Sequence, residues 1–145
     1  MAADAWVVHD KAMQKMVDGT IDVDNDSFVI RLYTSASNVA TTTVDDATTA
    51  TNELGTANGY TAGGDAVTLS DSESGGITTV STTEASWTAS GGNIVARYAG
   101  LVDTTTTPDT LVAHSLLDNT PADITATDGN PLTINAGSVF TVARA

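Results

Sequence analysis

The sequence predicts a mainly β fold, an antiparallel β-sandwich or jelly-roll-like domain with one short N-terminal helix. Threonine, a β-branched residue that suits half-exposed strands, occurs 26 times, whereas Glu and Lys, which favour helical surfaces, occur three times and twice. Short apolar runs also alternate with glycine, asparagine and proline turn signals along most of the chain. With 145 residues and no linker-like stretch or fixed-period repeat, residues 1–145 are expected to form a single β domain.

The helix is expected in the N-terminal segment, residues 1–19, and specifically over residues 3–17. Its apolar residues recur at a spacing close to one helical face: Trp6, Val7, Met13, Met16 and Val17. Gly19 then supplies a stop signal.

The strongest strand signal is the run FVIRLYT at residues 28–34. Apolar side chains lie on both of its faces, Phe28 on one and Tyr33 on the other, so both faces are expected to be covered. Further strands are expected at residues 20–24, 66–70, 77–82, 85–88, 94–102, 111–117, 124–127, 132–134 and 138–143.

Residues 35–64 are rich in Thr, Ala, Asn and Gly and are expected to form a long loop, with one helical turn near residues 52–54. Loops of this length are uncommon inside compact domains unless they have a function. We therefore expect this loop to clasp a neighbouring subunit.

The charge balance limits the classes of partner. The chain has five basic and eighteen acidic residues, giving a net charge of −13. It therefore lacks the basic surface that nucleic-acid binding requires, and no nucleic-acid partner is expected. No run approaches the roughly 18 apolar residues of a membrane span, so no membrane contact is expected. An acidic, lysine-poor surface suits high salt and indicates a halophilic source; an ordinary acidic secreted or viral protein is the alternative.

Three alternating carboxylates, Asp22, Asp24 and Asp26, resemble the opening of a calcium loop. The sixth and twelfth positions of such a loop should be Gly and Glu, but they are Ser27 and Tyr33 here. We interpret the segment as a solvated acidic turn and expect no metal and no cofactor.

No catalytic constellation is apparent, so a non-enzymatic protein is expected. His9 and His114 have no partner at ligand spacing, no nucleophile elbow is present, and the chain has no cysteine. His114 is predicted to be a hydrogen-bonded sheet residue. Trp87 and Tyr98 are predicted to be core residues, although a carbohydrate platform is the alternative.

Three glycine pairs are interpreted as hairpin turns, because none lies in the strand-to-helix context of a phosphate-binding loop. They occupy residues 63–64, 75–76 and 91–92.

Five segments in a fixed order suggest a family. They are DGTIDVD at 18–24, FVIRLY at 28–33, NGYTAGG at 58–64, WTA at 87–89 and ARYA at 96–99. In this combination the chain resembles a family of small virion structural proteins encoded among the head and tail genes of tailed viruses. The excess of Asp and Thr differs from the commoner bacteriophage versions and fits a virus of a salt-loving archaeon.

This resemblance implies a virion protein that decorates or cements the capsid by binding the major capsid protein or other virion proteins. The alternatives are a neck or tail accessory protein and a receptor- or glycan-binding module at a tail tip. The resemblance also implies that Arg97 pairs with a buried or interfacial carboxylate.

The apolar residues on both faces of the predicted strands indicate a homo-oligomer, and a trimer is our expectation. The candidate interface residues are Trp6, Val7, Met13, Tyr33, Tyr60 and Arg97. We further expect that removing residues 1–17 leaves the domain folded.

The charge predicts how salt affects stability. The melting temperature should rise as KCl is raised from about 0.1 M to about 2 M, because repulsion among the acids is screened while apolar burial is strengthened. Thermal melts followed by circular dichroism provide the measurement. A melting temperature that stays flat or falls would contradict the halophilic interpretation.

Overall fold

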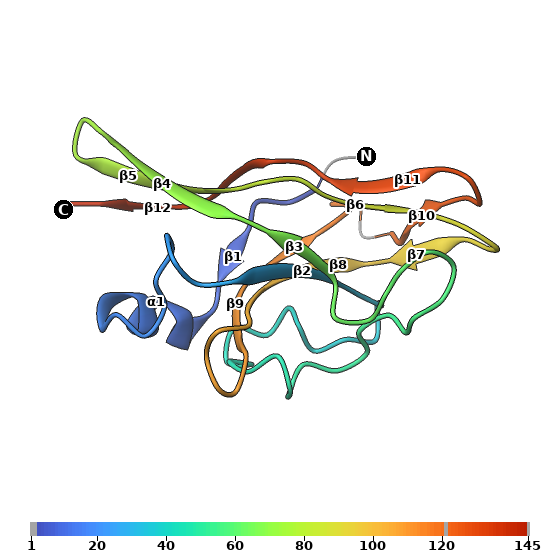
Figure 1. Cartoon of the computed structure of the whole chain (residues 1–145), viewed down its shortest axis with the longest axis horizontal. Helices are drawn as coiled ribbons and strands as arrows, with labels where there is room; N and C mark the ends of the chain where they lie inside the picture. The colour runs from blue at the N-terminus through green and yellow to red at the C-terminus, as the bar shows by residue number, and fades with distance from the viewer. Residues whose placement is uncertain (1–2, 121, 145) are drawn as a thin grey trace.

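The computed structural model describes residues 3–120 and 122–144 and is mainly β, with antiparallel sheets and one short helix, as the sequence predicts. Figure 1 shows two β layers, with the helix at one end and a long loop beneath the lower layer. The elements are β1 (Val7–Val8), α1 (Asp10–Val17), β2 (Phe28–Tyr33), β3 (Asp65–Val67), β4 (Leu69–Ser74), β5 (Ile77–Thr82), β6 (Ala85–Thr88), β7 (Ile94–Ala96), β8 (Tyr98–Asp103), β9 (Thr110–Leu116), β10 (Ile124–Ala126), β11 (Pro131–Ile134) and β12 (Gly137–Ala143).

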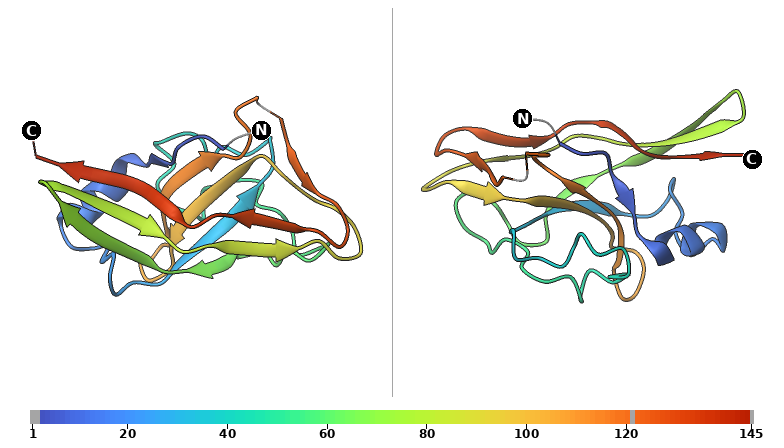
Figure 2. Two further views of the ribbon diagram at one scale, coloured as in Figure 1. Left: turned by 90° about the horizontal axis from the view of Figure 1, so that it is seen from above. Right: turned by 180° about the vertical axis from the view of Figure 1, so that it is seen from behind.

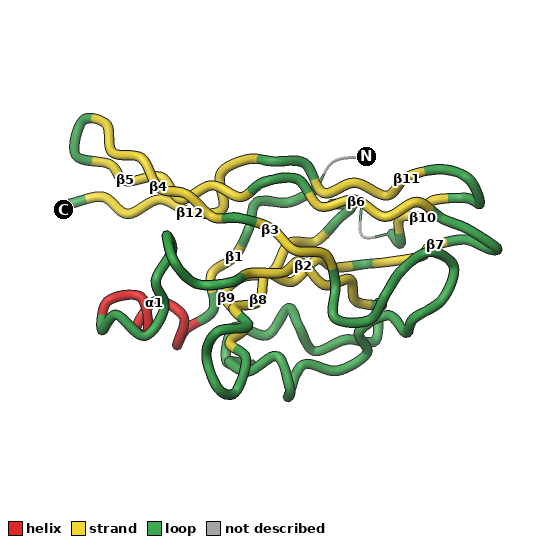
Figure 3. The backbone as a smooth tube through the Cα atoms, in the orientation of Figure 1, coloured by secondary structure: helices red, strands yellow, loops and turns green. Residues whose placement is uncertain are grey.

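The lower layer is a five-stranded sheet in the order β1-β9-β8-β2-β3, antiparallel throughout. The upper layer contains a three-stranded sheet, β12-β5-β4, and the pair β11-β6. Because β5 leads into β6 and β11 leads into β12, these strands run as one long ribbon, best seen from above in Figure 2. The pair β10-β7 lies at the end opposite α1 (Figure 3).

The main hydrophobic core lies between the two layers. Phe28, Ile30 and Leu32 alternate along β2 and are buried in it. Trp87 from β6 packs there against Tyr60 with ring centroids 5.6 Å apart, which confirms the core prediction for Trp87.

The long loop covers the outer face of the five-stranded sheet, so its contacts are within the same chain. Val39 and Ala47 from the loop are buried against side chains of β2, β8 and β9, including Tyr33 and Leu111. Gly100 in β8 is required there, since a Cβ would lie 2.8 Å from the Tyr33 ring. The loop is therefore a third layer of this domain, and a contact of its exposed residues with a neighbouring subunit stays a prediction.

The N-terminal helix is shorter than predicted. Val7 and Val8 are extended and pair with Ala113 and His114 of β9, and α1 begins only at Asp10. β-branched residues beside a free sheet edge gain more from strand pairing than from a helical turn.

This segment also contributes to the core, because His9 and Ala12 are fully buried. Removing residues 1–17 would therefore expose part of the interior, and whether the truncated domain folds stays a prediction.

Other element predictions are corrected locally. Residues 20–24 form a turn rather than a strand, and residues 52–54 form no helical turn because Asn52 has a positive φ of 58°. The predicted strand 94–102 divides at Arg97 between two sheets, and 66–70 divides at Thr68.

The glycine pairs differ in role. The pair at 75–76 forms the β4–β5 hairpin turn, as predicted. The pair at 63–64 ends the long loop that joins β2 to β3 of the same sheet, and the pair at 91–92 joins β6 to β7, which belong to different sheets. Within the described residues, no helix is long and apolar enough to span a membrane.

The buried loop predicts a stability effect. Val39→Ala should lower the free energy of unfolding by about 2 kcal/mol, because it removes two buried methyl groups and leaves a cavity. Urea titration of the isolated protein measures this, and the exposed Thr43→Ala in the same loop is the control. Equal stability of the two variants would show that the loop does not pack on the sheet in solution.

Candidate functional site

The structure brings the three candidate metal ligands into one exposed turn, but it uses their oxygens locally. Asp22 accepts hydrogen bonds from the Asp24 N–H at 3.1 Å and the Asn25 side-chain amide at 2.8 Å, and Asp26 accepts one from the Asp22 N–H at 2.7 Å. The Asn25 bond holds the pKa of Asp22 below its usual value. In the described part of the chain, no cluster of three or more His, Asp or Glu side chains could hold a metal ion.

The two histidines meet in the interior, a contact that sequence reasoning did not find. The Nε2 of His9 lies 3.0 Å from the Nδ1 of His114, and the Nδ1 of His9 lies 2.7 Å from the carbonyl oxygen of Val44. A carbonyl can only accept, so His9 is protonated on Nδ1, its Nε2 accepts, and His114 donates from Nδ1. The pair joins the long loop, the residue before α1, and β9.

Burial keeps this pair uncharged. Desolvation lowers the pKa of His9, partly opposed by the Val44 carbonyl, Asp45 and Asp10. Desolvation and the neighbouring His9 lower the pKa of His114 to about 4. At neutral pH the two rings are therefore uncharged, and the hydrogen bond between them links the residue before α1 to β9. His114 does lie in a strand as predicted, although its partner is a side chain.

Two predicted interface residues, Tyr33 and Tyr60, are 1% and 2% exposed and cannot present surface to a partner in this fold. The Tyr60 hydroxyl donates to Glu53 at 2.8 Å and accepts the Leu32 N–H at 3.1 Å. Burial raises the pKa of both tyrosines, that of Tyr33 to about 12. Both residues fix the loop to β2, so their assignment to an interface is corrected.

Arg97 is half-buried and pairs with Asp123 of the same chain, whose side chain is 40% exposed, so this partner is not the buried carboxylate that the resemblance implies. Its Nε donates to Asp123 at 2.7 Å, which joins the segment between β7 and β8 to the segment before β10. Its backbone N–H also donates to the Tyr33 carbonyl at 2.8 Å. Arg97 therefore holds strands together.

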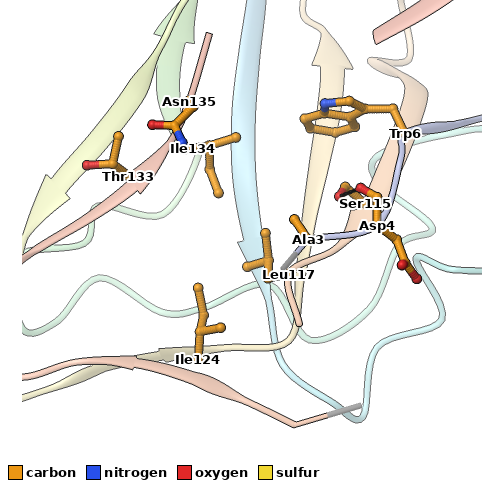
Figure 4. A pocket seen from close by; sticks show the side chains of 9 residues that line it. All are labelled: Ala3, Asp4, Trp6, Ser115, Leu117, Ile124, Thr133, Ile134 and Asn135. Atoms are coloured by element: carbon orange, nitrogen blue, oxygen red, sulfur yellow. Dashed lines mark hydrogen bonds between the residues drawn. The ribbon is translucent and has the colours of Figure 1, made fainter. Parts of the chain in front are cut away.

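Trp6 lies on the wall of a pocket of about 300 Å³ (Figure 4). Its indole stands across the pocket from Thr133, Ile134 and Asn135, with Leu117 and Ile124 between them. The pocket is thus lined by one aromatic side chain, by aliphatic side chains and by four polar residues, Asp4, Ser115, Thr133 and Asn135. An aromatic face beside hydroxyl and amide groups suits a small amphipathic ligand such as a sugar ring.

A second cavity, of about 260 Å³, is an apolar groove between α1 and β12. Met13, Val17 and Val142, which line it, are 53%, 90% and 59% exposed. The groove residues are Val8, Met13, Met16, Val17, Phe140, Thr141 and Val142. Of the predicted interface residues, Met13 lies in this groove and Val7 in the adjoining strand β1.

Comparison of the chain with family models, with curated proteins and with solved structures gives no match.

The histidine pair predicts a loss of stability in weak acid. The folded-state pKa of His114, about 4, lies below the unfolded value of about 6.5, so the unfolded chain binds more protons between these values. The free energy of unfolding should fall by about 2 kcal/mol between about pH 7 and about pH 5. Urea titrations at both pH values measure the change. His114→Gln should reduce it; the same pH dependence in that variant would assign the effect to other groups.

Proposed function

We propose that this chain is a non-enzymatic structural protein of the virion of a tailed virus, which decorates or cements the capsid. Its partners in this proposal are the major capsid protein or other virion proteins, together with further copies of itself. The five segments that resemble small head and tail proteins support the viral assignment. In the structure these segments form a turn (18–24), strand β2 (28–33), part of the long loop (58–64), the end of β6 (87–89) and the junction of β7 with β8 (96–99).

The observation that carries the proposal is the uncovered apolar groove between α1 and β12. A protein of net charge −13 has little reason to expose Met13, Val17 and Val142 together unless that surface is covered in an assembly. Arg97, Tyr33 and Tyr60 stabilise the domain, so the contact role falls on the N-terminal segment and β12.

The acidic surface supports a halophilic setting for this virion. Dense carboxylates keep a particle component soluble where salt promotes aggregation, and screening removes most of their mutual repulsion. Lysine, which would pair with those acids, occurs only twice.

A receptor- or glycan-binding role at a tail tip is the second candidate, and the Trp6 pocket favours it. The test is a glycan titration followed by tryptophan fluorescence in Trp87→Phe, so that Trp6 is the remaining emitter. A saturable shift that Asn135→Ala abolishes would favour this role.

Copy number distinguishes the roles. Quantitative mass spectrometry of purified particles should find hundreds of copies of this chain per particle, because a cementing protein occupies the symmetry-related sites of the shell. A dozen or fewer copies would move the chain to the neck or tail. Absence from particles would contradict the virion assignment.

A further inference from the structure

The outer edge of β12 pairs with no other strand among the described residues, and β12 has no charged side chain that would block such pairing. β12 pairs with β5 only, while β4 forms the opposite edge of this three-stranded sheet. β4 carries Asp71 and Glu73, the kind of charge that blocks strand addition. β12 carries Ser, Val, Phe, Thr, Val and Ala over residues 138–143 and no charge. The two edges of one ribbon thus differ: one is blocked and the other is open.

The apolar groove lies directly beside this open edge. Phe140 and Val142 are two residues apart on the strand, so they share one face, and both line the groove that separates β12 from α1. Figure 1 shows the ribbon of β4, β5 and β12 extending above α1 at the end of the molecule that also contains the C-terminus. A strand added to β12 would place alternate side chains over the exposed Met13 and Val17.

The charge around the groove favours a second copy of this chain as the occupant. The two elements that border the groove, with the residue that follows β12, contain three of the five basic residues of the chain, Lys11, Lys15 and Arg144, and one of its acids, Asp10. Lys11 pairs with Asp45 at 3.2 Å. In a chain of net charge −13, this face is where two copies meet with the least repulsion.

We propose that two copies of this chain pair through β12, antiparallel about a two-fold axis at Thr141. Phe140 of each copy then lies opposite Val142 of the other, and the two three-stranded sheets join into one. β12 of each copy also covers the groove of the other copy. One contact therefore pairs both free strand edges and covers both grooves. Pairing of β12 with β12 of a second copy has two-fold symmetry and leaves no further edge of this kind free. The proposed oligomer is therefore a dimer, in place of the trimer expected from the sequence.

This inference rests on the proposed function only in treating the groove as a contact surface, and it is tested on the isolated protein. Light scattering after size exclusion in about 1 M KCl, where the Debye length is about 3 Å, should give the mass of a dimer. Val142→Asp and Val17→Asp should each raise the dimer dissociation constant about tenfold or more, because each places a carboxylate in the covered groove.

Val95→Asp is the matched control, since Val95 is 41% exposed on β7 at the far end of the molecule. It should leave the dimer intact, and all three variants should keep the wild-type circular dichroism. A monomeric wild-type chain, a trimer, or a dimer unaffected by Val142→Asp would overturn the proposal.

A cross-link tests the register independently. The chain contains no cysteine, so Thr141→Cys introduces one thiol per copy. Directly opposite residues of an antiparallel pair have Cα atoms about 4.5–5.5 Å apart, within disulfide range. Mild oxidation should give a covalent dimer with Thr141→Cys and much less with Val95→Cys.

Equal cross-linking of the two cysteine variants would contradict the pairing. Dimers that are absent from particles would instead contradict the virion assignment while leaving the self-pairing intact.

Discussion

The central constraint on this structure is that its five-stranded sheet is apolar on both faces. Every residue from Ala99 to Asp103 in β8 and from Thr110 to Ser115 in β9 is buried. A sheet of this kind is stable only when both faces are covered. The ribbon of β4, β5, β6, β11 and β12 covers one face, and the 35–64 loop covers the other. The loop has little regular structure, so its backbone N–H and C=O groups find hydrogen-bond partners outside it. The Ala47 N–H donates to the Asp109 carbonyl and the Asp45 carbonyl accepts from the Leu111 N–H, both at 2.9 Å.

Part of the aspartate and threonine excess has a local cause in turns. Asp18, Asp103 and Asp118 each accept a hydrogen bond from the backbone N–H of the threonine two residues later. This side-chain-to-backbone bond fixes a turn without glycine. Hydrogen bonds from the Thr20 side chain and N–H lower the pKa of Asp18, and those from the N–H and side chain of Thr120 lower the pKa of Asp118. The composition therefore reflects turn chemistry as well as charge, and the acids contribute to order within the fold as well as to solvation.

Most strands were predictable from the sequence because short runs rich in apolar and β-branched residues are bounded by turn signals, and β2 adds a clear alternation of Phe28, Ile30 and Leu32. β1 was not, since a two-residue strand has no measurable period and depends on β9 for its partners. The role of the loop was missed because Val39 and Ala47 are isolated apolar residues whose burial depends on a sheet face built from distant segments. The contact between His9 and His114 spans 105 positions, and the only sequence signal was that the chain has two histidines.

The position of β1 has a consequence for how the chain reaches its final form. β1 and His9 are synthesised about a hundred residues before their partners on β9, which lie beyond residue 110. During synthesis at roughly 5–20 residues per second, the β1 segment therefore waits for several seconds without its sheet. Closing such a long chain interval is also entropically costly, which makes docking of the N-terminus a late event in folding. The apolar side chains of this segment are thus available to other molecules in the nascent chain, before α1 and β12 border the groove.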